Sequence, residues 1–250
     1  MDSVDAVALP HSVDIAAVVL GAAQGALFAS GVAKERRIDL IGIALISIAT
    51  GVGGGIVRDV LLNEPPVALS NNEYLSAALI AAIVTVVFGR LIARLDPLVV
   101  AFDALSLGLY LVVGLSKAVS LGLGAVPAVF IGILACTAGG VIRDLLLRTE
   151  VALVTVGSFY AFATLGGALV YMGVLQTVGQ GPATWAAVCV TFGVRMLSIW
   201  FGWSTPHASA LSFDAGVETV ERLAHSGAEA ITRGRKGFLR GEAAGREVDG

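Results

Sequence analysis

Two short elements of the sequence place charged residues directly after glycines inside apolar stretches. The first runs from Gly53 to Leu62, and the second follows eighty-five residues later, from Ala138 to Leu147. An arginine within hydrocarbon costs about 2.5–3.5 kcal/mol, so it must face a partner or a water-filled cavity. Glycines let helices kink or approach each other closely. The residues concerned are Gly53, Gly54, Gly55, Arg58 and Asp59, and Gly139, Gly140, Arg143 and Asp144.

Three arrangements would satisfy the arginines: structural ion pairing, lining of a pore, or extension of the side chain to the end of a span. Adjacent residues point about 100° apart around a helix, so a bridge between neighbours is not assured. In an inverted duplication the pairs would instead form across the copies, Arg58 with Asp144 and Arg143 with Asp59. A charge swap between Arg58 and Asp144 tests this hypothesis.

Three further charged residues fall in or beside apolar runs. Asp103 is either a site for a cation or a proton, or a helix-start acid that accepts backbone N–H bonds, and we favour the second interpretation. Lys117 is expected to extend to the surface, although Lys34 takes the equivalent place in the first half. Arg195 has no acid near it in the sequence, so we expect its partner on another span or subunit.

The composition explains why these charges matter. Of 250 residues, 56% are hydrophobic and only 14% are charged, and the mean hydropathy is +0.87. Soluble proteins carry about 25% charged residues, so this composition predicts an all-α integral membrane protein. Crossing a bilayer takes about 20 apolar residues. Seven stretches qualify: 13–33, 38–62, 74–94, 97–117, 123–147, 157–175 and 182–203.

The repeated glycine elements divide the spans into two halves. Residues 13–94 contain three predicted spans with the first element in the middle one, and residues 97–175 repeat this order. Because three is odd, the second half must cross the membrane in the opposite direction. Such inverted repeats are typical of channels and transporters, whose interrupted helices meet near the midplane. Residues 182–203 form the seventh span, and 204–250 form a polar tail.

The distribution of basic residues predicts the orientation. The face reached after the first span receives Lys34, Arg36, Arg37, Arg90, Arg94 and Arg148 and the tail, whereas the opposite face receives only Lys117. Basic loops stay in the cytoplasm. We therefore expect the N-terminus outside and the C-terminus in the cytoplasm, with a tail that is solvated rather than helical on anionic lipid.

Several function classes do not fit the sequence. With 16 Lys+Arg against 19 Asp+Glu and a net charge of −3, there is no surplus of positive charge to hold a nucleic acid. Two cysteines and three histidines are scattered singly, so no metal site can be assembled from their spacing. No set of nucleophile, base and orienting group recurs, and no phosphate-binding loop is present. We expect no enzyme activity and no cofactor.

The twin Gly-Gly-x-x-Arg-Asp elements at 54–59 and 139–144, together with the six-plus-one spans, resemble the prokaryotic trimeric intracellular cation (TRIC) channels. The resemblance covers about 13–203. It implies a homotrimer in the prokaryotic inner membrane, with one pore per subunit along spans two and five. It also implies that K⁺ permeates, with Na⁺ as a second ion. The five glycines would be kink positions, and Arg58, Asp59, Arg143 and Asp144 the polar set around the pore. From the sequence itself we add Lys117 and Asp103 as candidate polar or gating residues.

A carrier is the alternative to a channel. Two inverted halves could rock around a midplane site where an arginine binds a small carboxylate, such as that of glycine. A basic residue beside a cation pore hinders conduction, which keeps this alternative open. The adjacent Asp59 and Asp144 reduce that objection, and the resemblance favours the channel.

Overall fold

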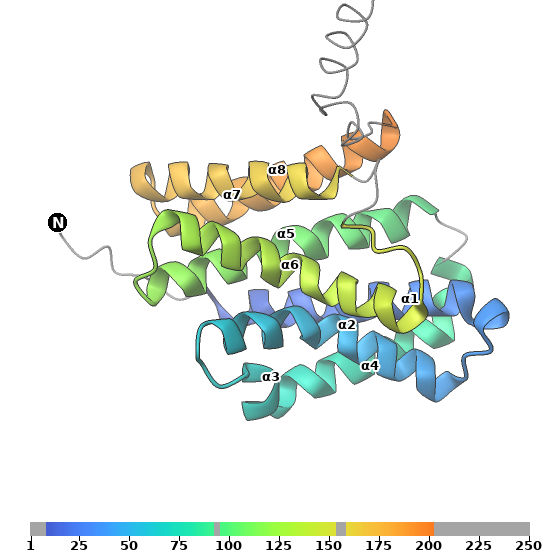
Figure 1. Cartoon of the computed structure of the whole chain (residues 1–250). Coiled ribbons are helices and arrows are strands. Elements are labelled where there is room, and N and C mark those ends of the chain that lie inside the picture. Colours follow the sequence, from blue (N-terminus) through green and yellow to red (C-terminus); the bar gives the residue numbers. More distant parts are fainter. Residues whose placement is uncertain (1–8, 93–95, 154–158, 203–250) are drawn as a thin grey trace, which may run out of the picture. The chain divides into compact units, whose positions relative to one another are not determined.

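The computed structural model describes residues 9–92, 96–153 and 159–202, with side chains except at 34–36 and 89–99. The described chain is all-helical, and its helices belong to one compact unit, Met1–Thr205 (Figure 1). The helices are α1 (His11–Arg36), α2 (Leu40–Leu61), α3 (Val67–Ser70), α4 (Asn72–Ile92), α5 (Asp96–Ser120), α6 (Ala125–Leu147), α7 (Tyr160–Thr177) and α8 (Gln180–Trp200).

Each of the seven predicted stretches coincides with one long helix, and no boundary differs by more than three residues. The additional helix, α3, has only four residues and follows two prolines. It is too short to form an apolar run from which it could have been predicted. Among the described residues, α1, α2, α5, α6 and α8 contain segments long and apolar enough to cross a membrane. The all-helical membrane class is thus confirmed. The predicted tail, 204–250, and the side chains of Lys34, Arg36, Arg90 and Arg94 lie outside the described residues.

Small residues allow the central helices to pack closely. Helix α1 packs against α2, α4 and α5. A Cβ added at Gly25 would lie 2.7 Å from the Cβ of Thr50, and one at Gly51 would lie 2.9 Å from the carbonyl oxygen of Val18. Real Cβ atoms do not come this close, so α1 and α2 approach to backbone contact. This brings the polar side chains of α2 close to those of α1.

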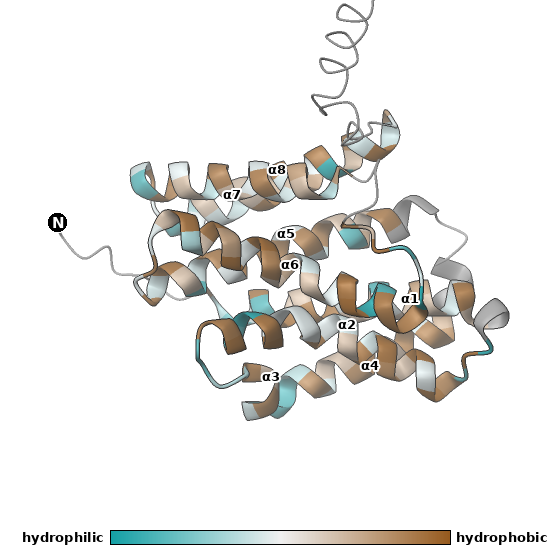
Figure 2. Cartoon of the chain, viewed as in Figure 1, coloured by the Kyte–Doolittle hydropathy of each residue, from teal (hydrophilic) through white to brown (hydrophobic). Residues whose placement is uncertain are grey.

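Large apolar side chains cover much of the outer surface. Ile41, Val87 and Val126 are 68%, 67% and 81% exposed, and apolar residues recur along the outer helices in Figure 2. In water such a surface would drive association, whereas in hydrocarbon it is the expected exterior. The buried charged side chains of the described residues instead lie on α2 and α6: Arg58, Asp59, Arg143 and Asp144.

Candidate functional site

Helices α2 and α6 run in opposite directions (Figure 1) and cross at Gly54 and Gly139. A Cβ added at Gly54 would overlap the carbonyl oxygen of Ala135, and one at Gly139 would overlap that of Thr50. Gly54 therefore faces Ala135, four residues before Gly139, and Gly139 faces Thr50, four residues before Gly54. Both helices stay α-helical through these positions. The glycines permit close contact here, and a kink at them stays a prediction.

A buried group of charges, the Asp59 cluster, lies beyond the crossing at the C-terminal end of α2. Asp59 accepts hydrogen bonds from Arg58 Nε at 2.7 Å, Lys117 Nζ at 2.8 Å and the backbone N–H of Val67 at 3.0 Å. Arg58 Nη1 also lies 3.6 Å from Asp14. Arg58 and Asp59 are 2% and 1% exposed. Asp59 thus joins α2 to α5 and fixes the chain that enters α3.

An equivalent arrangement lies at the C-terminal end of α6. Asp144 accepts from Arg143 Nε at 2.8 Å and from the backbone N–H of Ala152 at 3.1 Å. The bonded N–H lies eight residues after the aspartate, as it does for Asp59. The Arg143 guanidinium stacks on Phe28, 4.1 Å from the ring centroid. Each aspartate therefore anchors the loop that follows its helix, a role that the sequence did not suggest.

The predicted pairing across the two halves is wrong. Each arginine bonds the aspartate next to it, because its long side chain folds back along its own helix. The Nη2 atoms of Arg58 and Arg143 lie 3.9 Å from the positions that a Cβ at Gly55 or Gly140 would take. Extension to the surface is also excluded, because both arginines are buried. Lys117 likewise bonds Asp59 instead of extending to the surface.

The Lys117 bond is expected to stabilise the fold only modestly. In Lys117→Met, Asp59 keeps Arg58 and the Val67 N–H, and the lost ammonium is partly exposed. We expect the free energy of unfolding in detergent to fall by about 1 kcal/mol. A loss as large as that in Asp59→Asn would show that Lys117 is an essential partner of Asp59.

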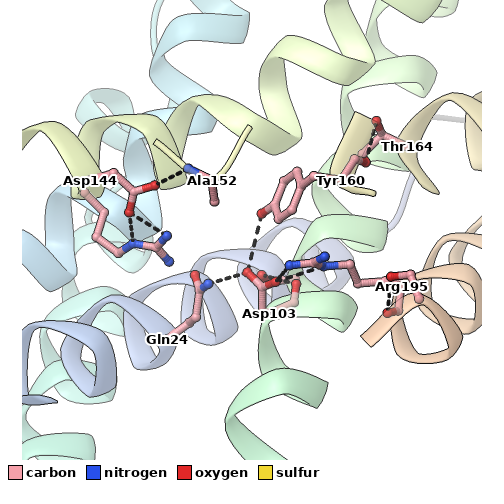
Figure 3. Close-up of polar contacts among 10 residues, drawn as sticks. Gln24, Asp103, Asp144, Ala152, Tyr160, Thr164 and Arg195 are labelled. Carbon is pink, nitrogen blue, oxygen red and sulfur yellow. Dashed lines mark hydrogen bonds and ion pairs between the residues drawn. The ribbon is translucent and has the colours of Figure 1, made fainter. Parts of the chain in front are cut away.

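The preferred interpretation of Asp103 is also wrong. Helix α5 begins at Asp96, so Asp103 lies two turns inside it and accepts from side chains of other helices. These are the Gln24 amide, the Tyr160 hydroxyl at 3.4 Å and the Arg195 guanidinium at 3.4 Å, as Figure 3 shows. We call this group the Asp103 cluster. The expected partner of Arg195 on another span is confirmed.

Two cavities lie beside these clusters. The larger, about 360 Å³, is lined by polar groups that include His11, Asp14, Arg58, Tyr74, Ser116 and Lys117. The smaller, about 10 Å³, lies at the crossing of α2 and α6, and its lining includes Gln24, Thr50, Gly54, Tyr110, Gly139 and Tyr160. The Tyr110 hydroxyl donates to the carbonyl oxygen of Gly51 beside this narrow space. The cavity at the Asp59 cluster is therefore much larger than the cavity at the crossing.

The two Arg-Asp pairs lie toward opposite ends of α1. Arg58 approaches Asp14, whereas Arg143 stacks on Phe28, fourteen residues further along the same helix. At 1.5 Å per residue, these contacts are about 21 Å apart. Gly21 and Gly25 of α1, which lie between them, pack against α2 next to the crossing. The buried charges therefore lie on both sides of the crossing of α2 and α6.

Comparison with known proteins identifies the family. The family model described as Glycine transporter matches residues 11–90 and 100–176. In structure, the chain is similar to the TRIC trimeric intracellular cation channel orthologue from Rhodobacter sphaeroides, with a TM-score of 0.70 and 28% identity. This match covers 77% of the present chain and 97% of that one. The chain belongs to the TRIC family. The resemblance inferred from the twin glycine elements is confirmed.

Relatives of the chain are described as membrane proteins. A membrane protein of Deinococcus radiodurans is 39% identical over 54% of the present chain, and the match spans 62% of that relative. The inner membrane protein YadS of Escherichia coli is 29% identical over 76% of this chain and 92% of its own length. The present chain is thus an integral membrane protein, like its relatives.

The sequence missed several residues of the site. Asp14 lies at the very start of the first predicted span, 13–33, where an acidic residue is unremarkable. Gln24 gave no signal, because an isolated amide in an apolar run has no fixed role. Tyr74 and Tyr160 occupy matching places in the two halves, which was a usable signal. Each bonds an aspartate of a neighbouring helix, Asp14 and Asp103 respectively.

Proposed function

We propose that this protein is a cation channel that conducts K⁺, with Na⁺ as a second permeant ion, through a pore in each subunit. The observation that carries the proposal is the crossing of α2 and α6 at Gly54 and Gly139, with polar cavities beside it. The structural similarity to a TRIC cation channel supports it. In the conducting state the five glycines bend α2 and α6 and widen the constriction.

The buried guanidinium groups support a hydrated path. Nη1 of Arg58 and Nη1 of Arg143 have no hydrogen-bond partner among the described residues, although both side chains are buried. Such groups are normally satisfied by water. Water in a path along Arg58 and Arg143 would satisfy them without a further protein partner. The adjacent carboxylates offset their positive charge, which answers the main objection to a basic residue beside a cation path.

Seven spans in two inverted repeats, with the N-terminus outside, fit these contacts. The equivalent bonds of Asp59 and Asp144, each to an N–H eight residues later, are what a duplication predicts. The family model also matches two segments that correspond to the two halves. On this topology the Asp59 cluster faces the outside, and Arg143 lies toward the cytoplasm.

A homotrimer is the assembly we propose. The orthologue from Rhodobacter sphaeroides is described as trimeric, and the exposed apolar helix faces provide surface for contact with other subunits within the membrane. Lipid covers the remaining apolar surface.

Measurement of K⁺ efflux and glycine uptake in the same proteoliposomes tests the proposal against the carrier. We expect rapid K⁺ efflux that does not saturate at accessible K⁺ concentrations, with no glycine uptake above that of empty liposomes. The carrier alternative is supported by the family description and by a cavity that contains both basic and acidic groups. Saturable uptake of labelled glycine without K⁺ efflux would contradict the channel.

A further inference from the structure

We propose that Asp14 and Asp103 determine the selectivity of this protein for cations over anions, one on each side of the constriction. The inference rests on the proposed channel function. Asp14 lines the larger cavity directly. Asp103 lies behind Gln24 and Tyr160, which line the smaller cavity.

The four aspartates beside these cavities and arginines fall into two kinds. Asp59 and Asp144 are 1% and 2% exposed and are held by ionic bonds of 2.7–2.8 Å together with a backbone N–H. Asp14 and Asp103 are more open, with side chains 16% and 15% exposed, and they lie 3.6 Å from Arg58 and 3.4 Å from Arg195, respectively. Asp14 and Asp103 are therefore the more accessible of the four carboxylates and the less tightly paired.

The same chemistry recurs at both positions. The Tyr74 hydroxyl donates to Asp14 at 2.8 Å, and the Tyr160 hydroxyl donates to Asp103 at 3.4 Å. A tyrosine holds each carboxylate in place without cancelling its charge. Asp14 and Gln24, the partner of Asp103, are ten residues apart on α1, or about 15 Å. The two carboxylates therefore act at different depths of the path.

Charge balance explains why the loss of either aspartate changes selectivity. Arg58 and Lys117 are balanced by Asp59 and Asp14, so the wild-type Asp59 cluster with Asp14 is neutral. Removing the charge of Asp14 leaves one positive charge uncompensated beside the cavity. On the other side, Arg143 and Arg195 are balanced by Asp144 and Asp103. A fixed positive charge in a confined path repels cations and attracts anions.

Tyr160 connects the Asp103 cluster to Arg143. Its hydroxyl lies 3.8 Å from the position that a Cβ at Gly140 would take, and Arg143 Nη2 lies 3.9 Å from the same point. The Arg195 guanidinium stacks on the Tyr160 ring at 4.7 Å. Tyr160 therefore contacts Arg195 and lies near Arg143, and Asp103 supplies negative charge next to Arg195.

The test is the reversal potential of single channels in a KCl gradient across a planar bilayer. Asp14→Asn and Asp103→Asn are each expected to lower the permeability ratio of K⁺ to Cl⁻ by roughly tenfold. Asp14→Asn should selectively reduce K⁺ current that enters from the Asp59 cluster side, and Asp103→Asn should reduce current in the opposite direction. Asp14→Glu and Asp103→Glu should retain the wild-type ratio.

Glu150→Gln serves as the matched control, because it removes a carboxylate from an exposed position that lines neither cavity. Thermal unfolding of each purified variant shows whether it is folded. If the wild type conducts cations and both folded Asn variants have the same reversal potential as Glu150→Gln, the inference about selectivity is wrong. The proposed channel function would not be affected by that result. If the wild type carries no current, the proposed function fails, and this inference fails with it.

Discussion

Gly54→Ala and Gly139→Ala are expected to lower the free energy of unfolding by about 3 kcal/mol or more. At each position the new methyl group would overlap a backbone carbonyl oxygen of the opposite helix, at Ala135 or Thr50. Backbone atoms cannot rotate away as a side chain can, so α2 and α6 must separate. Forced separation of a packed interface costs about 1–3 kcal/mol, and more where backbone must move. Thermal unfolding in detergent measures the loss.

The neighbouring glycines provide matched controls in the same helices. A Cβ at Gly55 would have its nearest neighbour, a guanidinium nitrogen, at 3.9 Å, and one at Gly140 would meet the Tyr160 hydroxyl at 3.8 Å. These are ordinary contacts. Alanine favours helix over glycine by about 1 kcal/mol, so Gly55→Ala and Gly140→Ala should unfold at or above the wild-type temperature. Equal destabilisation at all four positions would contradict the close crossing.

Asp59→Asn and Asp144→Asn are expected to destabilise the protein by about 3–5 kcal/mol each. Asp59→Asn leaves Arg58 buried without its carboxylate and removes the partner of Lys117. In Asp144→Asn, Arg143 loses the carboxylate with which it forms an ion pair. Breaking a buried ion pair from one side leaves an uncompensated charge, and this accounts for the large effect. Chemical or thermal unfolding in detergent measures it.

A double-mutant cycle identifies the partner of Arg58. Arg58→Gln combined with Asp59→Asn should be much less destabilising than the sum of the two single changes, because the second change removes a charge that the first left unpaired. Arg58→Gln combined with Asp144→Asn should be additive, since these residues do not bond. A coupling energy between Arg58 and Asp144 that is larger than the one between Arg58 and Asp59 would contradict the observed pairing and support ion pairs across the two halves.

The sequence predicted the helices well because length and hydropathy alone define a membrane span. It also singled out Gly54, Gly139 and the two Arg-Asp pairs, since charges and glycines are conspicuous in apolar surroundings. It did not predict which groups bond. The pairing of Arg58 with Asp59 depends on a side chain that folds back along its own helix, and no spacing rule specifies this.

Contacts between helices could not be predicted from the sequence, for a different reason. Lys117 reaches Asp59 and Arg195 reaches Asp103 because α5 packs beside both α2 and α8. That packing depends on the whole bundle, and no local pattern specifies it. Asp14 was overlooked because it lies at the polar edge of a span. Its role became visible only when Tyr74 and Arg58 were found beside it.

Single-channel recording of the wild type beside the Gly54→Leu/Gly139→Leu double variant tests most directly whether cations pass along the crossing of α2 and α6. Gly173→Leu serves as the folded control, because Gly173 is exposed on α7 and an added Cβ there meets no atom within 4 Å. We predict discrete unitary K⁺ currents in the wild type and in Gly173→Leu, and none in the double variant, whose leucines fill the constriction. Unchanged unitary currents in a folded double variant would show that ions take another route and would contradict the proposed pore.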